Sequence, residues 1–184
     1  MTDAEPVDLW EGLNPPYSTI VADPPWPTTT GPEWGSSGPS KPLAYSTMTP
    51  REIANMNLAG MAGPDAHLYL WTINGYLDAA HGIARGWGFS PSTTLVWCKA
   101  PHGLGMGGTY SLTTEYVLFA RRGTLAAKTR IDTTWFGWPR GAHSVKPQAF
   151  YDLVERVSPG PYIELFARQP RLGWDSWGHG YEQA

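Results

Sequence analysis

Residues 18 to 26 read STIVADPPW, and this stretch decides how the rest of the chain is interpreted. Ser18 to Asp23 forms a β-branched run that is typical of a buried strand. The run stops at Pro24-Pro25, because two consecutive prolines fix φ at both positions and remove two amide donors. The sequence therefore predicts a strand that ends in a rigid turn carrying the Asp23 carboxylate.

The turn Asp23-Pro24-Pro25-Trp26 offers hydrogen-bond acceptors at its tip. An exocyclic amine has two N–H donors, which the Asp23 carboxylate and the Pro24 carbonyl can accept together. Trp26 supplies a flat surface for the ring that carries such an amine. A structural turn, with Asp23 as a cap and Trp26 covering the sheet edge, is the alternative that the four residues leave open.

Helix signals and strand signals alternate along the rest of the chain. Thr49-Pro50-Arg51-Glu52 has the arrangement of a capping box and predicts the start of a helix. Further helices are predicted over 77–88 and 147–157, and further strands over 67–71, 93–99, 113–120 and 162–166, the last of these being the final strand. This alternation predicts an α/β fold, a three-layer sandwich whose ligand sites lie at the carboxyl ends of the strands.

Composition favours one folded domain over residues 1–184, with an N-terminal segment at 1–17 and a C-terminal tail at 169–184. Hydrophobic residues make up 41% of the chain and charged residues 16%, which is unlike a disordered chain. The single Cys98 and five scattered histidines point to no disulfide framework and no metal site. Without an apolar run of membrane-spanning length, we expect a cytoplasmic protein with no membrane partner.

A net charge of −3 does not draw the whole chain toward a phosphate polymer, so any grip on nucleic acid must be local. Between residues 121 and 146, aromatic side chains are interleaved with basic side chains. This combination is found in proteins that bind single strands or flipped nucleobases. A solvated, partly structural segment explains the same residues. The basic residues are Arg121, Arg122, Lys128, Arg130, Arg140 and Lys146, and the aromatic residues are Trp135, Phe136 and Trp138.

Four short motifs, in this order, together resemble the MT-A70 family across residues 18–180. They are Val21-Ala-Asp23-Pro-Pro-Trp26, Ala44-Tyr45-Ser-Thr-Met48, His143-Ser-Val-Lys146-Pro147 and Ile163-Glu164-Leu-Phe-Ala-Arg168. Members of this family are S-adenosylmethionine-dependent methyltransferases that modify N6 of adenine in DNA or RNA. The resemblance implies a Rossmann-like methyltransferase fold with permuted motif order, in which the catalytic turn comes first and the cofactor strand comes last.

The resemblance also implies a role for each matching residue. The catalytic turn is Asp23, Pro24, Pro25 and Trp26, and Tyr45, Glu115 and Lys146 line the substrate pocket. S-adenosyl-L-methionine is expected to contact Asp8, Leu9, Asp23, Ser144, Lys146, Glu164, Phe166, Arg168 and His179. The chain departs from the family pattern at Ala167, where a glycine is frequent, and at His179-Gly180, where polar amides are usual.

Plainer interpretations stay open for three of these residues. Lys146 is also consistent with a solvated residue before the helix, and Glu115 with a partner of Arg121 or Arg122. Glu164 can equally form an ion pair with Arg168. The run Gly103 to Gly108 lacks the following helix that a dinucleotide-binding loop requires, and is predicted to be a loop.

The function that these residues predict is methylation of adenine N6 in nucleic acid, with DNA favoured. Two alternatives accompany it. One is a non-catalytic nucleic-acid-binding or scaffold subunit of a methyltransferase complex, and the other is methylation of RNA adenine or of cytosine N4. So short a chain leaves little room for a recognition domain, and a homo-oligomer or a separate recognition subunit is therefore a further expectation.

Overall fold

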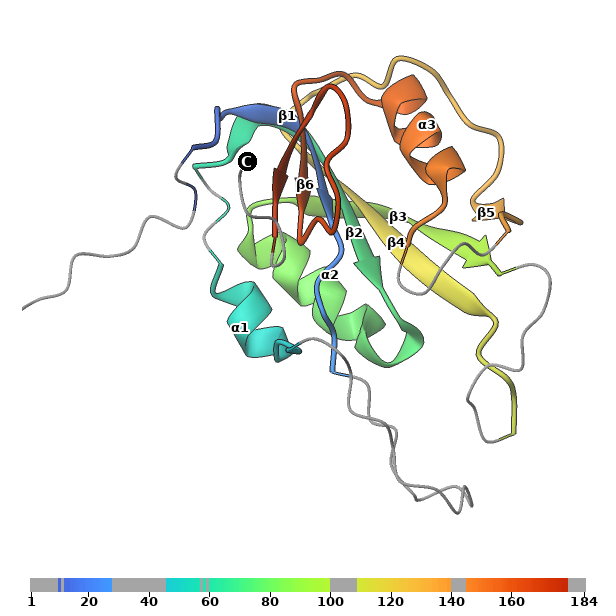
Figure 1. Cartoon of the computed structure of the whole chain (residues 1–184). Helices are drawn as coiled ribbons and strands as arrows, with labels where there is room; N and C mark the ends of the chain where they lie inside the picture. The colour runs from blue at the N-terminus through green and yellow to red at the C-terminus, as the bar shows by residue number, and fades with distance from the viewer. Residues whose placement is uncertain are drawn as a thin grey trace, which may run out of the picture.

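A seven-stranded mixed sheet forms the centre of the molecule (Figure 1). The computed structural model describes residues 10, 12–27, 46–56, 58, 60–99, 109–139 and 145–178. The strands are β1 (Tyr17–Ala22), β2 (Ala62–Thr72), β3 (Ser90–Cys98), β4 (Thr114–Arg122), β5 (Trp135–Phe136), β6 (Tyr162–Leu165) and β7 (Trp174–Trp177). Their order across the sheet is β5-β3-β4-β2-β1-β6-β7.

The strand directions bring the ends of five strands to one edge of the sheet. Strand β1 runs parallel to β2 and β6, so that Ala22 pairs with Leu70 on one side and Leu165 on the other. Strand β4 is antiparallel to both β2 and β3, and its first residue, Thr114, pairs with Cys98 at the end of β3. The amino end of β4 therefore lies beside the carboxyl ends of β1, β2, β3 and β6.

Helices cover both faces of the sheet, which confirms the predicted three layers (Figure 1). Helices α1 (Pro50–Ala54) and α2 (Leu77–Gly86), with the 3-10 turn η2 (Asn74–Tyr76), lie on one face, and α3 (Gln148–Val157) lies on the other. Helix α1 begins with the predicted capping box, in which the Thr49 hydroxyl accepts from the Glu52 amide and Glu52 accepts from the Thr49 amide. No helix in the described part of the chain is long and apolar enough to cross a membrane.

The two faces of the sheet bury different kinds of side chain. Successive residues of β2 point to opposite faces, so that Leu68 and Leu70 pack with α1 and α2 while Tyr69 and Trp71 pack with α3. The α3 layer is rich in aromatic rings, and Trp71 contacts Trp97 and Phe150 edge to face. Seven further buried side chains, all aromatic or aliphatic, complete this cluster. Many of the tryptophans are therefore core residues rather than ligand platforms.

The strand predictions need correction at three places. The strand at 162–166 is not the last, because residues 174–177 of the predicted tail pair with it as β7, and the two-residue β5 was not predicted either. Arg121 and Arg122 belong to β4, because they pair with β2, and the chain turns only at Gly123, whose φ is 63°. Both missed strands are short and sit at the sheet edges, where sequence periodicity is weakest.

Candidate active site

Four ionisable side chains that the sequence predicts for the site meet where the strand ends come together. Asp23 directly follows β1, Glu115 stands near the start of β4, Lys146 precedes α3 and Glu164 lies in β6. A cavity of about 160 Å³ opens beside them, lined by Asp23, Val145, Lys146, Tyr151, Glu164, Phe166, Arg168, Gln169 and Arg171. Ligand sites of open α/β sheets are expected at this edge.

Lys146 is the centre of the charged cluster. Its Nζ lies 3.0 Å from Asp23 Oδ1 and 3.2 Å from Glu115 Oε2, and it stands 4.7 Å from the centroid of the Trp71 ring. The other oxygen of Glu115 lies 2.6 Å from the Nζ of Lys99. Lys146 is thus not a solvated residue, and Glu115 is paired with lysines instead of the arginines considered from the sequence. Both plainer interpretations are wrong.

The pKa values of the two carboxylates that share Lys146 are shifted in opposite directions. Burial raises the pKa of Asp23, and the attraction of Lys146 only partly offsets it. Burial acts in the same direction on Glu115, but two lysines outweigh it and lower the pKa of that carboxyl. Burial alone would lower the pKa of Lys146, yet Asp23 and Glu115 raise it, so the lysine is firmly charged. Asp23 is therefore the least compensated charge of the group.

Glu164 forms a second buried polar group in the cavity lining. The Tyr151 hydroxyl donates to Glu164 Oε1 at 2.5 Å, and burial raises the pKa of this carboxyl. Arg171 lies over the Tyr151 ring, with its guanidinium carbon 3.4 Å from the ring centroid, and donates to the Gln148 side chain at 2.7 Å. Helix α3 thus positions one wall of the cavity through Tyr151.

The turn after β1 is held rigid by hydrogen bonds to its own carbonyls. The Trp26 amide donates to the Pro24 carbonyl at 2.8 Å, and the Met48 amide donates to the Pro25 carbonyl at 2.9 Å. The Pro24 oxygen therefore has one of its two lone pairs left for a ligand. Together these bonds fix where the acceptors of the turn point.

Trp26 differs from its predicted stacking role. Its side chain is 6% exposed, lies in the core with α1 and α2, and stacks on Tyr76 at a centroid distance of 5.1 Å. The indole N–H donates to the Trp71 carbonyl at 2.9 Å. A ring that is buried and already stacked cannot offer an open face to a target base, so Trp26 anchors the turn instead.

The chain leaves β6 through a tight turn that also lines the cavity. Phe166 has a φ of 65°, a backbone conformation that bulky residues rarely adopt and that is held here by close packing. Gly178 lies against this turn, where a Cβ atom would come within 2.3 Å of the Ala167 carbonyl oxygen. The Ala167 amide donates to the Trp177 carbonyl at 2.9 Å, so β7 fixes the turn that presents Phe166 and Arg168.

Several predicted site residues lie outside the described residues. These are Asp8, Leu9, Tyr45, Ser144 and His179, together with the run Gly103 to Gly108 and the base Arg140. Other residues reach the site without having been predicted for it: Lys99, Trp71, Tyr151 and Arg171. Lys99 and Trp71 are the last residues of the predicted strands 93–99 and 67–71, so their positions at the carboxyl edge were a usable signal. Tyr151 and Arg171 depend on how α3 and the segment before β7 pack, which the sequence does not reveal.

The basic segment between residues 121 and 146 does not form a single surface. Arg121 and Arg122 are neighbours in β4 and point to opposite faces, and Arg122 donates to the Ala62 carbonyl. Lys128 donates to the Glu155 carbonyl at the end of α3, and Lys146 is buried in the site. Phe136 stacks on Trp138 at 4.6 Å, so these two rings are occupied with each other. The platform predicted from composition is divided among separate structural roles.

The sheet order and the acidic turn at its carboxyl edge are those of a Rossmann-like methyltransferase fold, with the Asp23 turn after β1 and strand β6 late in the chain. The chain belongs to the MT-A70 family, whose model matches residues 17–180. This match covers all the described residues that form the cavity. It confirms the family resemblance and the fold class that the sequence predicts.

Similar proteins include methyltransferases of different kinds. A Mycoplasma protein, type II methyltransferase M.MunI, is 29% identical, over 88% of this chain and 76% of its own length. The N6-methyladenosine RNA methyltransferase MTA1 of Cryphonectria parasitica is 27% identical, over 93% of this chain and 53% of its own. The human N(6)-adenosine-methyltransferase catalytic subunit METTL3 is 24% identical. The chain covers only 26% of METTL3, so it corresponds to one part of that longer protein.

Proposed function

We propose that this chain methylates N6 of adenine in nucleic acid, with S-adenosylmethionine as the methyl donor and DNA as the polymer. The observation that carries the proposal is the buried cluster in which Lys146 joins Asp23 and Glu115 at the cavity edge. Membership of the MT-A70 family supports the adenine N6 chemistry. The higher identity to the type II methyltransferase than to the proteins named as adenosine or RNA methyltransferases supports DNA.

The chemistry of the turn suits an amine that is a poor nucleophile. The lone pair of adenine N6 is delocalised into the ring, and acceptors that bind both N–H groups favour a more tetrahedral nitrogen. Asp23 offers a carboxylate oxygen for one N–H, and Pro24 offers its remaining lone pair for the other. Because these acceptors are fixed before the substrate arrives, little reorganisation is needed during the reaction.

Lys146 favours the ionised form of Asp23 in a place where burial and the negative charge of Glu115 both work against it. With its pKa raised, Asp23 is also a better proton acceptor than an exposed carboxylate. The nitrogen becomes cationic when it gains the methyl group, and its proton can then pass to Asp23 or to water. Asp23 therefore orients the amine first and need not act as a base before transfer.

The cavity residues fit S-adenosylmethionine by charge. The cofactor supplies a methyl group on a positively charged sulfur, and its amino acid end carries both an ammonium and a carboxylate. Asp23 and Glu164 suit the cationic groups and hydroxyl donors, while Arg168 and Arg171 suit the carboxylate. Arg171 Nε is a buried donor without a hydrogen-bond partner among the described residues, as expected of a group that awaits an acceptor.

A non-catalytic subunit is the competing function, and the acceptor turn argues against it. A protein that only binds nucleic acid has no need for three ionised side chains buried at a cavity, because each costs free energy to desolvate. The substrate could also be supplied or positioned by a second copy of the chain or by a recognition subunit. A homo-oligomer or a complex with a recognition subunit is therefore part of the proposal.

The test is methyl transfer from methyl-labelled S-adenosylmethionine to matched DNA and RNA strands, followed by digestion to nucleosides. We expect label in N6-methyldeoxyadenosine. Asp23→Asn should reduce turnover by about 10²–10³-fold, by analogy with the loss of one preorganised transition-state hydrogen bond. The control is Asp78→Asn, which removes the same charge from an exposed position of α2. Label found only in RNA would show that the substrate is RNA and not DNA. Normal turnover of Asp23→Asn would refute the proposed role of the turn.

A further inference from the structure

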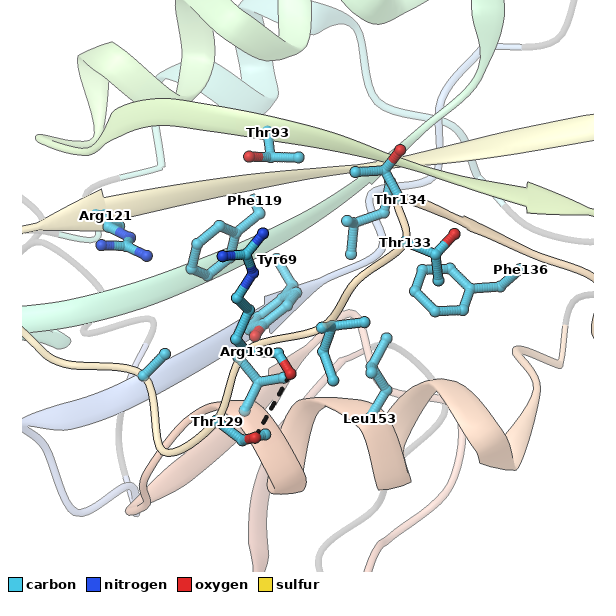
Figure 2. A pocket seen from close by; sticks show the side chains of 14 residues that line it. Tyr69, Thr93, Phe119, Arg121, Thr129, Arg130, Thr133, Thr134, Phe136 and Leu153 are labelled. Carbon is cyan, nitrogen blue, oxygen red and sulfur yellow. Dashed lines mark hydrogen bonds between the residues drawn. The ribbon is translucent and has the colours of Figure 1, made fainter.

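A second and larger cavity, of about 420 Å³, lies on the α3 face of the sheet. Figure 2 shows it between the strands and α3, with the segment at 127–134 running across it. Tyr69 and Phe119 in its lining are core side chains, 2% and 9% exposed, whose rings pack against each other 5.0 Å apart. Its two arginines are exposed. The buried polar side chains that could act on a ligand therefore lie in the smaller cavity beside Asp23.

Tyr151 of α3 is a buried tyrosine in the lining of this smaller cavity. Its hydroxyl donates to Glu164 Oε1 at 2.5 Å, a length typical of an O–H group bonded to an ionised carboxylate. Among the described residues, this hydroxyl is the one donor bonded to the Glu164 side chain. The second carboxylate oxygen of Glu164 is therefore available to a ligand.

The Tyr151 ring is fixed by contacts on its face and at its edge. The guanidinium carbon of Arg171 lies 3.4 Å from the ring centroid, and Arg171 donates to the Gln148 side chain at 2.7 Å. Trp174 of β7 meets the ring edge to face, with the two centroids 5.8 Å apart. A side chain that is locked by packing holds its polar group in one direction. The hydroxyl of Tyr151 is thus aimed at Glu164 before any ligand binds.

We infer that Tyr151 is a positioning residue, whose hydroxyl holds Glu164 so that the second carboxylate oxygen accepts a hydrogen bond from the cofactor. The inference rests on the proposed function, since it takes S-adenosylmethionine as the ligand. Two parts of that molecule carry suitable donors, the hydroxyl groups of the ribose and the ammonium of the amino acid end. Without the Tyr151 hydroxyl, the cofactor has to order the carboxylate as it binds, which weakens its affinity.

The same hydrogen bond favours the ionised form of Glu164. Burial raises the pKa of this carboxyl, and the negative charge of Asp23 acts in the same direction. The Tyr151 hydroxyl is the largest influence that lowers the pKa, ahead of the cations Arg171 and Lys146. Removing the hydroxyl therefore leaves a carboxyl that is protonated at a higher pH, and a protonated carboxyl is a poorer acceptor.

The experiment is calorimetric titration of the whole chain with S-adenosylhomocysteine, the product form of the cofactor, which measures binding without methyl transfer. Tyr151→Phe should bind it about tenfold more weakly, the loss expected for one hydrogen bond to a charged group. Its affinity should also begin to fall at a higher pH than that of the original chain. The control Tyr162→Phe removes a hydroxyl that donates to the Ser158 carbonyl, outside the cavity lining, and should bind normally.

Glu164→Gln tests the same hydrogen bond from the carboxylate side. It should weaken binding to a similar degree, and adding Tyr151→Phe to it should cause little further loss, because the hydroxyl acts through the carboxylate. Two analogues of S-adenosylhomocysteine identify the donor, one without the ribose hydroxyls and one without the amino acid end. The analogue that lacks the donor should bind Tyr151→Phe and the original chain equally.

The inference is overturned if folded Tyr151→Phe binds S-adenosylhomocysteine as tightly as the original chain at every pH, or if Glu164→Gln does. It is also overturned if both analogues keep the full difference between the original chain and Tyr151→Phe, because the carboxylate then contacts neither donor. These results leave the proposed function untouched. If the original chain itself fails to bind S-adenosylhomocysteine, the proposed function fails and this inference fails with it.

Discussion

The α3 face of the sheet contains two buried polar clusters at opposite ends, and they are built in different ways. At the carboxyl edge, Lys146 joins the ionised side chains of Asp23 and Glu115. Toward the other end, His67 and Ser158, both fully buried, are joined in a chain of neutral groups. Both clusters interrupt an otherwise apolar layer, but only the first does so with charges.

The neutral cluster satisfies each of its members. His67 Nδ1 lies 2.7 Å from Ser158 Oγ, and His67 Nε2 lies 3.1 Å from the Leu125 carbonyl. Since a carbonyl only accepts, Nε2 carries the hydrogen, and Nδ1 accepts from the Ser158 hydroxyl. Ser158 in turn accepts from Tyr69 at 2.8 Å. Burial lowers the pKa of His67, which keeps the ring neutral.

The difference in charge between the two clusters distinguishes a structural role from a catalytic one. The hydrogen-bonded chain through His67 links β2, the segment after β4 and the end of α3. It carries no net charge, and its hydrogens are already donated within the protein. The Lys146 cluster borders a cavity and includes a carboxyl, Asp23, whose pKa burial raises despite its lysine partner. Buried charges are retained at a cost in stability, and such groups gather at functional sites.

Lys146→Met should break the charged cluster with the largest effect. The substitution leaves two carboxylates close together and without their shared cation, and loss of one partner from a buried pair costs about 3–5 kcal/mol of unfolding free energy. Urea unfolding measures this loss, and methyl transfer should disappear with it. Lys128→Met is the control, since Lys128 is exposed and donates to the Glu155 carbonyl and the Tyr162 hydroxyl. Equal stability of the two variants would contradict the central role of Lys146.

His67→Phe should sharpen the contrast by costing stability alone. The change removes the acceptor of the Ser158 hydroxyl hydrogen and the donor to the Leu125 carbonyl, at about 1–3 kcal/mol. Activity per folded molecule should persist, because the cavity at the carboxyl edge keeps all its side chains. Ser158→Ala tests the same chain from its other end and should also reduce stability. Loss of turnover in both folded variants would show that the neutral cluster serves the reaction as well.

The pH dependence of stability distinguishes His67 further. In the unfolded chain its pKa is about 6.5, and burial lowers it in the folded protein. The unfolded state therefore binds more protons in this range, so the contribution of His67 to stability is present above its unfolded pKa and is lost as pH falls through the folded pKa. Unfolding midpoints of His67→Phe should vary less with pH over this interval than those of the original chain.

The sequence predicts the parts of the molecule that depend on local signals. The capping box at Thr49, the helix stop after Val157 and the strand that ends at Asp23 are all set by neighbouring residues, and the structure confirms them. Strand β7 escapes prediction because its residues, Trp174 to Trp177, become a strand only through pairing with β6. Edge strands depend on a partner that is distant in the sequence.

In the candidate site, too, some features are predictable from the sequence and others are not. Family motifs point to Asp23, Lys146 and Glu164, and the structure brings all three to one cavity. The burial of Trp26 arises from packing between elements and carries no local signal, and the pairing of Lys99 with Glu115 depends on which strands become neighbours in the sheet. Which residues meet is thus partly predictable from strand ends, whereas which side of a ring remains open is decided by tertiary packing.

Lys99→Met should have the smallest effect, and it tests how the charged cluster distributes its charge. Lys99 lies 2.6 Å from one oxygen of Glu115, and it also stands 5.6 Å from the Trp97 ring centroid. Without Lys99, Glu115 keeps only Lys146 as a cation, and its pKa should rise toward its ordinary value. Since both members of the pair are less than one-fifth exposed, we expect a loss of about 1 kcal/mol in unfolding free energy, at the upper end for partly solvated pairs.

The sign of this effect with pH separates charge from packing. The lowered pKa of Glu115 contributes stability above its unfolded pKa of about 4.3, and that contribution is lost as pH falls through the folded pKa. The difference between Lys99→Met and the original chain should therefore be largest at neutral pH and vanish once Glu115 is protonated in both, as urea midpoints measured along a pH series will report. A loss that is equal at every pH would instead assign the contribution of Lys99 to its contact with Trp97, and Lys146 would then be the cation that alone holds Glu115 ionised.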